Sequence, residues 1–461
     1  MNKYSTLFLL IFLGLAIKSN AQVPNTLSPA QKIYGLSKIW QEVNYNFIYY
    51  NRIDKKAWDS TYLSMITEVQ QTKNDYEYYM DLKRFMAFLK DGHSTVIMPP
   101  GIDTLLYGNN FGPYWFHLDN IDGKVIITHE KLSMKDKIPI GSEITEINGI
   151  TTSDYMRTKI EPYISSSTDY ILSQVAVYHL FEGFKGETWQ VKIRKPDGKT
   201  IALDLTHAPN HEKAVFPPYE EYKLFEFKWY DHDIAYLALN SFDDPKIDTL
   251  FLNILPKLYK AKGLIIDIRD NGGGSTDIGT NILKYLTKDS LLYGEKVVTR
   301  LNNSYYRAVG GWIKSSDTID NTEYRDCYLN YYDKYYHYFP FAPDTVKLKT
   351  KRIEIPTAIL TGNFTASAAE DFLIYADKCK NMIRIGEKTY GSTGMPYVFN
   401  LPGGGSARVC TVEDTYSDGR EFVGYGVIPN IEVKSTVQDF IDHKDPVMDK
   451  ALEYLEGKIG R

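Results

Sequence analysis

The sequence has few cysteines, no excess of positive charge and no long hydrophobic run beyond its start. Three cysteines in 461 residues (Cys327, Cys379 and Cys410) exclude a disulfide framework, and their spacing fits no metal site. Lys and Arg number 53 against 58 Asp and Glu, so nothing points to a nucleic-acid backbone as partner. Hydrophobic residues make up 43% and charged residues 24%, which is typical of a folded globular protein.

The first residues predict an export signal. Lys3 is followed by an apolar run over residues 7–17, which is shorter than the roughly 20 residues that span a bilayer. A small-x-small site ends at Ala21, just before Gln22. No cysteine follows the run, which disfavours a lipid anchor. We expect a signal peptide over residues 1–21 and a periplasmic or extracellular mature chain.

Three patterns follow along the chain. Residues 28–89 repeat apolar side chains at helical spacing and begin with Ser28-Pro29, a cap followed by a first-turn proline. Residues from about 111 to 205 predict short strands and turns, with one strand at 143–147 after a glycine turn. From residue 225 onward, strands alternate with helices, as in an α/β layer architecture. The strands are expected at 234–239, 263–268, 357–361 and 382–386, and the helices at 249–261, 275–286 and 367–378.

Ser367 lies where a buried strand turns into a helix, within TGNFTASAAEDF (residues 361–372). Backbone N–H groups at a helix start are unpaired, and the helix dipole is positive there. That is a suitable place for a nucleophilic hydroxyl and the oxyanion it generates. A serine in this position is more often only a helix cap, so both interpretations stay open.

A second motif, DIRDNGGG (residues 267–274), directly follows a buried strand. Three successive glycines let the backbone turn sharply and approach a ligand closely. Its N–H groups could hold a carbonyl oxygen, or the loop could be only a strained turn. It lacks the Gly-Lys-Ser/Thr of a P-loop, which argues against nucleotide binding.

These motifs occur in order with GEKTYG (residues 386–391) and GYGVIPNIEV (residues 424–433). Together, over about residues 225–433, they resemble the C-terminal processing peptidases. This family of serine peptidases includes the tricorn protease core and the interphotoreceptor retinoid-binding protein. Residues 141–149 resemble the PDZ-like domain of the family, and DGHS at residues 91–94 resembles its tricorn-like branch.

The resemblance implies an α/β fold with a crotonase-like ββα catalytic core, an N-terminal helical domain and a PDZ-like domain. It also implies a peptidase nucleophile at Ser367 and a mechanism that needs no cofactor and no metal. The expected order is a helical domain (22–105), a PDZ-like domain (106–210), a catalytic α/β domain (211–445) with a Tyr-rich insertion lacking a clear period (about 302–350), and a C-terminal helix (446–461).

The general base is predicted from one difference between this sequence and the family pattern. In the branch with a Ser-Lys dyad, the base is a lysine within a Tyr-Gly-Lys-Gly type motif, and Ser392 stands in its place. Lys388 is near in sequence, but a lysine is protonated at neutral pH unless its pKa is lowered strongly. The tricorn-like branch uses a histidine from the helical domain, and His93 in DGHS fits that place. Histidine titrates near neutral pH, so activity should rise around pH 6 to 7.

A histidine base usually needs a third group that fixes its tautomer. The family pattern favours Glu421, which could equally be an exposed strand carboxylate. Asp91 and Glu370 are the alternatives, although Glu370 could simply favour the dipole of its own helix.

Backbone groups complete the expected site. The family pattern implies oxyanion donors in the N–H groups of Gly272 or Gly273 and of Ala368. Gly141 and Ile144, around the turn of the PDZ-like domain, are expected to bind substrate by strand addition.

The sequence therefore predicts an exported serine endopeptidase that acts on protein or peptide substrates. No nucleic acid or membrane span is expected, and the oligomeric state stays open. The alternative is a non-catalytic binding protein for a lipophilic ligand or peptide on the same fold, like the retinoid-binding relative. The presence of Ser367, His93 and the glycine loop argues against it.

Overall fold

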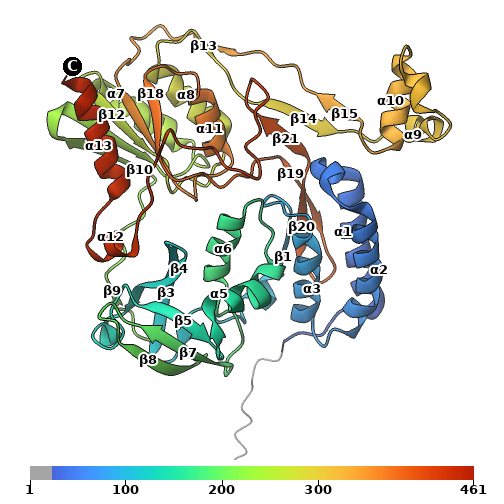
Figure 1. Cartoon of the computed structure of the whole chain (residues 1–461), viewed down its shortest axis with the longest axis horizontal. Coiled ribbons are helices and arrows are strands. Elements are labelled where there is room, and N and C mark those ends of the chain that lie inside the picture. The colour runs from blue at the N-terminus through green and yellow to red at the C-terminus, as the bar shows by residue number, and fades with distance from the viewer. Residues whose placement is uncertain (1–22, 461) are drawn as a thin grey trace, which may run out of the picture.

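The computed structural model describes residues 23–460, so the predicted signal peptide lies outside the described residues. Figure 1 shows a group of N-terminal helices, a middle unit around one sheet, and a larger unit around a second sheet. No helix within residues 23–460 is long and apolar enough to cross a membrane.

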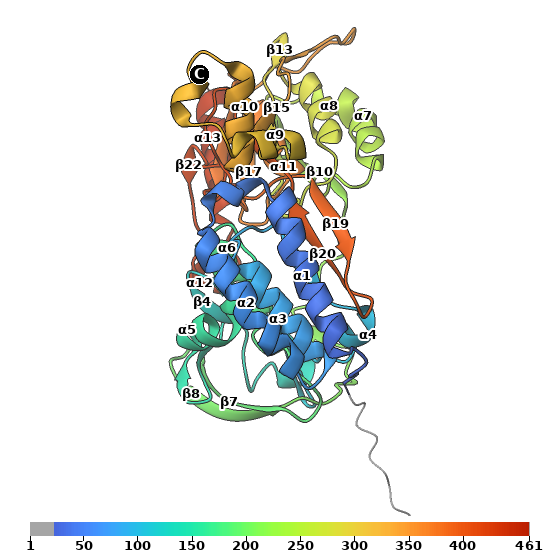
Figure 2. The same cartoon turned by 90° about the vertical axis from the view of Figure 1, so that its right-hand side faces the viewer.

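The N-terminal helices lie side by side (Figure 2) and are α1 (Pro29–Asn46), α2 (Lys55–Gln71) and α3 (Asp75–Ala87). Ser28 caps α1 by accepting a hydrogen bond from the Gln31 backbone, and Pro29 occupies the first turn, as the sequence predicts. After α3 the chain forms β1 (Thr95–Ile97) and the short α4 (Pro100–Asp103). Because β1 pairs with β20 (Ser406–Cys410), the end of this helical unit joins a strand of the larger unit.

The middle unit has a sheet with strand order β2-β3-β4-β5-β7-β8 and a hydrophobic core of its own. Helix α6 (Asp169–Tyr178) packs beside β3. The strands are β2 (Asn110–Phe111), β3 (Tyr114–Ile121), β4 (Lys124–Lys131), β5 (Glu143–Ile147), β7 (Thr188–Arg194) and β8 (Thr200–Thr206), with β6 (Ile150–Thr151), β9 (Val215–Phe216) and the short α5 (Thr152–Tyr155) at the margins.

The larger unit has a six-stranded sheet of order β10-β11-β12-β17-β18-β22, parallel except for β10. Its central strands are fully buried apolar runs, as expected for a sheet covered on both faces. The strands are β10 (Phe225–Tyr230), β11 (Ile234–Leu239), β12 (Gly263–Asp267), β17 (Thr357–Thr361), β18 (Met382–Gly386) and β22 (Ile431–Glu432).

Helices cover both faces of this sheet (Figure 1). One face packs against α7 (Lys246–Leu258), α8 (Thr276–Leu286) and α11 (Ala368–Ala376). The other packs against α13 (Pro446–Ile459), which follows the short α12 (Val437–Ile441). The α/β alternation predicted from the sequence is therefore confirmed.

The Tyr-rich insertion has more regular structure than its sequence suggested. It contains α9 (Ser304–Gly310) and α10 (Thr322–Tyr331), which stand away from the sheet at the end of a ribbon (Figure 1). The ribbon pairs β14 (Lys296–Arg300) with β15 (Tyr336–Tyr338) and β21 (Val412–Thr415). The remaining strands are β13 (Leu291–Leu292), β16 (Asp344–Thr345) and β19 (Pro396–Asn400), which pairs with β20.

Three neighbouring parallel strands position the functional motifs. The glycine loop follows β12, the Ser367 turn follows β17, and residues 387–394 follow β18. Because β12, β17 and β18 are adjacent and parallel, their carboxyl ends lie at one edge of the sheet. The fold therefore brings three segments that are distant in sequence to one place.

Candidate active site

Ser367 occupies a strained turn between β17 and α11. Its φ is 54° and its ψ is −126°, a combination that residues with a side chain rarely adopt. Ser367 and Glu370 occupy the two positions of a capping box at the start of α11, and the Glu370 carboxyl accepts from the Ser367 N–H at 3.2 Å. A strained serine at a strand-to-helix turn is typical of an exposed nucleophile.

The glycine loop packs against this turn. The Ala366 N–H donates to the Asn271 carbonyl at 3.0 Å, and a Cβ at Gly273 would lie 2.7 Å from Ser367 Cβ. With φ of 102°, Gly273 needs to be glycine both for its conformation and for this close approach. The loop can therefore hold an oxygen atom beside the serine.

The loop amides differ in what they bind. The Gly273 N–H donates to Asn271 Oδ1 at 2.9 Å. The N–H groups of Gly272 and Ala368 have no hydrogen-bond partner within residues 23–460, and Gly272 is exposed. Of the three donors expected from the sequence, Gly272 and Ala368 are the ones left free.

His93 lies at the end of the helical unit and contacts the segment that follows β18. Its Nδ1 lies 2.6 Å from Ser392 Oγ, in the segment that follows β18. Its loop is fixed by Ser94, whose hydroxyl donates to Asp91 Oδ2 at 2.5 Å and accepts from the Cys410 N–H at 2.9 Å. The histidine is thus held next to the position at which the family resemblance places a lysine.

Glu370 links the serine turn to the Ser392 segment. One of its oxygens, Oε2, accepts from the backbone N–H of Ser367 and of Ser392, both at 3.2 Å. The other, Oε1, accepts from the Gly391 N–H at 2.8 Å and from the Thr389 hydroxyl. A single buried carboxyl therefore holds the Ser367 backbone and the partner of His93 in register.

Burial shifts the pKa values of these groups in opposite directions. It lowers the pKa of His93 to about 4, with a further contribution from the positive charge of Arg408. It raises the pKa of Glu370 to about 7, against the four hydrogen bonds that this carboxyl accepts. His93 is therefore neutral at pH 7, the state in which an imidazole can accept a proton.

Residues around the start of α6 contact both the loop of His93 and the segment of Ser392. Ser167 Oγ accepts from the N–H of Gly92 at 2.9 Å, immediately before His93. The hydroxyl of Tyr170 donates to the Thr389 carbonyl at 2.6 Å. The middle unit is thus tied to the loop of His93 and to the segment of Ser392.

The structure does not bring Glu421 to His93. Glu421 is exposed and lies 3.5 Å from Arg52, while the ring nitrogen Nδ1 of His93 contacts Ser392. Within the described residues no hydrogen bond or ion pair joins Glu421 to His93, so the structure gives no support to Glu421 as the orienting group. Asp91 is fully buried and is bonded to Ser94, and Glu370 acts on the backbone of Ser367 and Ser392.

Gly141 and Ile144 are also not placed to bind a peptide. Strand β5 is paired on both edges, with β4 and with β7, and Ile144 is 1% exposed in the core of the middle unit. A Cβ at Gly141 would lie 2.8 Å from Ile441 of α12, which covers the turn. A strand in the centre of a sheet cannot accept another strand, so this expectation is corrected.

Two residues of the site were missed as participants. In the sequence, Ser392 stands out only as the residue in place of the family lysine. Its position just after the predicted strand at 382–386 could have indicated that it lies near Ser367. Tyr170 carried no sequence signal. Lys388, the competing base, is half-buried, and its side chain makes no hydrogen bond or ion pair with any described residue.

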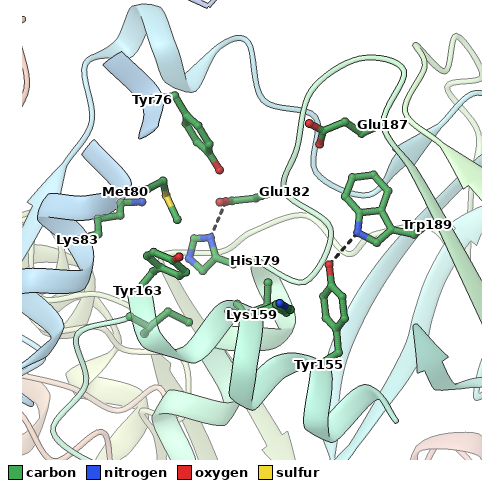
Figure 3. Close-up of a pocket in the computed structure, with 12 residues that line it drawn as sticks. Tyr76, Met80, Lys83, Tyr155, Lys159, Tyr163, His179, Glu182, Glu187 and Trp189 are labelled. Carbon is green, nitrogen blue, oxygen red and sulfur yellow. Dashed lines mark hydrogen bonds and ion pairs between the residues drawn. The ribbon is translucent and has the colours of Figure 1, made fainter. Parts of the chain in front are cut away.

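A separate cavity of about 280 Å³ lies between α3 and the middle unit (Figure 3). In it the His179 ring contacts Glu182 at 2.5 Å, and the Trp189 indole donates to the Tyr155 hydroxyl at 3.0 Å. None of the residues predicted for catalysis lines it. No group of three His, Cys, Asp or Glu within residues 23–460 is placed to hold a metal ion.

Comparisons with known proteins give the family context. Residues 233–433 match the sequence profile of peptidase family S41. The structure of mature CPAF complexed with lactacystin is similar at a TM-score of 0.62 and 16% identity, covering 94% of this chain and 98% of that one. A putative peptidase from Parabacteroides merdae gives 0.51 and 17%, covering 93% and 97%. No curated protein matches the chain.

Proposed function

The chain belongs to peptidase family S41, whose serine peptidases include the C-terminal processing peptidases, and we propose that it cleaves peptide bonds with Ser367 as nucleophile and His93 as general base. The enzyme class follows from the family. The residue roles are inferred from the geometry of the site.

Acyl transfer would proceed in two steps. Ser367 Oγ attacks the substrate carbonyl while His93 Nε2 takes its proton, and the imidazolium returns this proton to the leaving amine. Water, activated by the same imidazole, then releases the acyl group from Ser367. The free N–H groups of Gly272 and Ala368 would stabilise the oxyanion in both steps.

Ser392 takes the place of the third triad group. For Nε2 to accept a proton, Nδ1 must carry a hydrogen and donate it to Ser392 Oγ, at the observed 2.6 Å. A hydroxyl fixes the tautomer of the ring without adding a negative charge. Glu370 would position this pair by holding the backbone N–H groups of Ser392 and Ser367.

The observation that carries the proposal is the conformation of Ser367. A strained serine that packs against a glycine loop with free N–H groups is the arrangement expected of a nucleophile beside an oxyanion site. His93, which is neutral and contacts the Ser392 hydroxyl, would supply the general base.

An extended peptide would enter along the middle unit, which we interpret as PDZ-like. Strand β2 pairs only with Tyr114 and Trp115 of β3, so residues 118–121 of β3 have no strand on that edge within the described chain. Helix α6 lies beside this edge, and its Tyr178 ring is 6.1 Å from the ring of Phe364, three residues before Ser367. A peptide added to β3 would thus be directed to the nucleophile.

The decisive experiment replaces the nucleophile. Ser367→Ala should fold normally, lose casein hydrolysis and lose labelling by a serine-reactive phosphonate. Ser275→Ala is a matched control, because Ser275 also starts a helix, α8, without a side-chain cap bond. Casein cleavage by Ser367→Ala at the wild-type rate would show that another residue is the nucleophile.

Export is part of the proposal. The natural substrates would then be proteins or peptides of the periplasm or the surroundings of the cell. Mass spectrometry of the native protein should find the mature N-terminus at or near Gln22, whereas retention of Met1 would contradict export by a cleaved signal.

A further inference from the structure

Arg408 is a cation without a partner next to the candidate active site. It lies on β20 between Ala407 and Val409, which are both buried in the core, so its side chain projects from the opposite face. Its Nε is buried and has no hydrogen bond, and its guanidinium makes no ion pair with any residue from 23 to 460. An arginine left this way is uncommon, because a partly desolvated charge without a partner is costly.

The strand pairing places Arg408 beside the His93 loop. Arg408 pairs across β1 and β20 with Thr95, which is two residues after His93. Cys410, two residues further along β20, is bonded through its N–H to Ser94. The backbone of Arg408 is therefore fixed relative to the candidate base.

The charge of Arg408 acts on the side chains of the site. Burial lowers the pKa of His93, and Arg408 lowers it further. Burial raises the pKa of Asp91 and of Tyr390, and Arg408 opposes both shifts. Tyr390 lies in the segment of Ser392, so groups from both sides of the site experience the same cation.

None of the neighbouring carboxyls makes an ion pair with Arg408. Asp91 accepts from Ser94 through Oδ2; its other oxygen, Oδ1, is buried without a hydrogen bond to any described residue, and Asp91 makes no ion pair with Arg408. Glu370 accepts hydrogen bonds from the Ser367 turn and from the Ser392 segment. Glu413 pairs with Arg52 at 2.6 Å. The charge of Arg408 is thus left for a ligand.

We propose that Arg408 forms a carboxylate-binding subsite beside the His93 loop, and that it recognises a carboxylate of the peptide substrate. The planar fork of a guanidinium matches a carboxylate in a bidentate way, which a lysine cannot do. The carboxylate is either an Asp or Glu side chain near the scissile bond or the terminal carboxylate of the peptide. This inference rests on the proposed peptidase function.

The test uses pairs of peptides that differ in one charge. One set exchanges Glu for Gln at each position on both sides of the cleaved bond, and a second compares a free with an amidated C-terminus. For one position or for the free terminus, kcat/KM of wild type should favour the carboxylate by about 10- to 100-fold, the range of a charge-assisted hydrogen bond. Whichever set shows the preference identifies the source of the carboxylate.

Substitutions then assign the preference to this residue. Arg408→Gln should bring the ratio of kcat/KM within each pair close to one, and Arg408→Lys should restore only part of it. Arg420→Gln is the matched control, because Arg420 is already paired with Asp377 and Asp418, and it should keep the wild-type ratio.

The outcomes separate this inference from the proposed function. Cleavage that depends on Ser367 but ignores charge, or a preference that survives Arg408→Gln, overturns the subsite and leaves the peptidase intact. If the wild type cleaves nothing, the proposed function fails. Fluorescence anisotropy of the same peptide pairs with the Ser367→Ala chain then decides the subsite, and equal affinities within every pair overturn it.

Discussion

At the scale of single residues, the two candidate bases, His93 and Lys388, differ in their contacts. His93 contacts Ser392, whose backbone is joined through Glu370 to that of Ser367, whereas Lys388 has no hydrogen bond or ion pair with another described residue. His93→Ala should therefore lower kcat/KM by about 10²- to 10⁴-fold, the usual contribution of a general base. Lys388→Ala, assayed in parallel, should cost far less. Near-normal turnover of His93→Ala together with a dead Lys388→Ala would move the base to Lys388.

The pH profile gives a second test at this scale. An imidazole acts as a base only when neutral, so activity is lost as the pH falls through its pKa. Burial lowers the pKa of His93 to about 4, which is below the pH 6 to 7 expected from the sequence. The acid limb of kcat/KM for a small chromogenic ester should therefore lie at about pH 4 to 5. A limb near pH 6.5 would show that His93 is not desolvated in the free enzyme.

The charge of Arg408 also lowers the pKa of His93. Removal of its positive charge should let His93 bind a proton more easily, so the acid limb of Arg408→Gln should move to higher pH than in wild type. This shift would be seen even with neutral substrates, because it depends on the base and not on the ligand.

At the scale of elements, strand order explains why part of the site could be read from the sequence. Strands β11 and β17 were predicted with their observed bounds, because central parallel strands are continuous apolar runs. The glycine loop follows β12, so once β12 and β17 are neighbours, the loop and Ser367 must meet at their carboxyl ends. Local patterns were sufficient to place this part of the site.

Other features depend on pairing that local patterns do not contain. Whether β5 lies in the centre or at the edge of its sheet is decided by β4 and β7, so the expectation for Gly141 and Ile144 failed. Glu421 forms an ion pair with Arg52, from a distant helical segment, rather than a contact with His93. The order of motifs in the chain could not reveal either contact.

The glycine loop leads to a prediction about elements. Gly273→Ala would place a Cβ 2.7 Å from Ser367 Cβ at a φ of 102°, so loop and serine turn must separate. A misplaced oxyanion donor costs about 10²- to 10³-fold in kcat. Gly272→Ala keeps its N–H, and no atom would lie within 4 Å of the new Cβ, so its loss should be much smaller. Equal kcat values for the two variants would argue against an oxyanion role for the loop.

At the scale of the whole molecule, the candidate site is assembled from parts that fold around different cores. His93 comes from the helical unit, Ser367 and Ser392 from the larger unit, and Ser167 and Tyr170 from the middle unit. The helical unit shares its core with the larger unit, whereas the middle unit has its own core. The middle unit can therefore be altered without removing the main core.

This arrangement predicts two distinct effects of the middle unit on activity. Deleting residues 111–205 should be tolerated by the remaining fold, because the flanking Asn110 carbonyl and Ala208 N–H already lie 3.4 Å apart. The deletion removes the contacts of α6 with both catalytic segments, so short chromogenic substrates should be cleaved at least about 10-fold more slowly. Long substrates should lose more, because the free edge of β3 is removed as well.

Tyr170→Phe separates these two effects. It removes the hydroxyl that donates to the Thr389 carbonyl at 2.6 Å and to the Tyr425 carbonyl at 3.3 Å, and it leaves β3 in place. Loss of this hydroxyl should lower kcat/KM by about 2- to 10-fold, equally for short and long substrates. If the deletion leaves short substrates unaffected, the contacts of α6 do not position the catalytic segments. If it lowers short and long substrates by the same factor, the middle unit does not bind substrate and only supports the site.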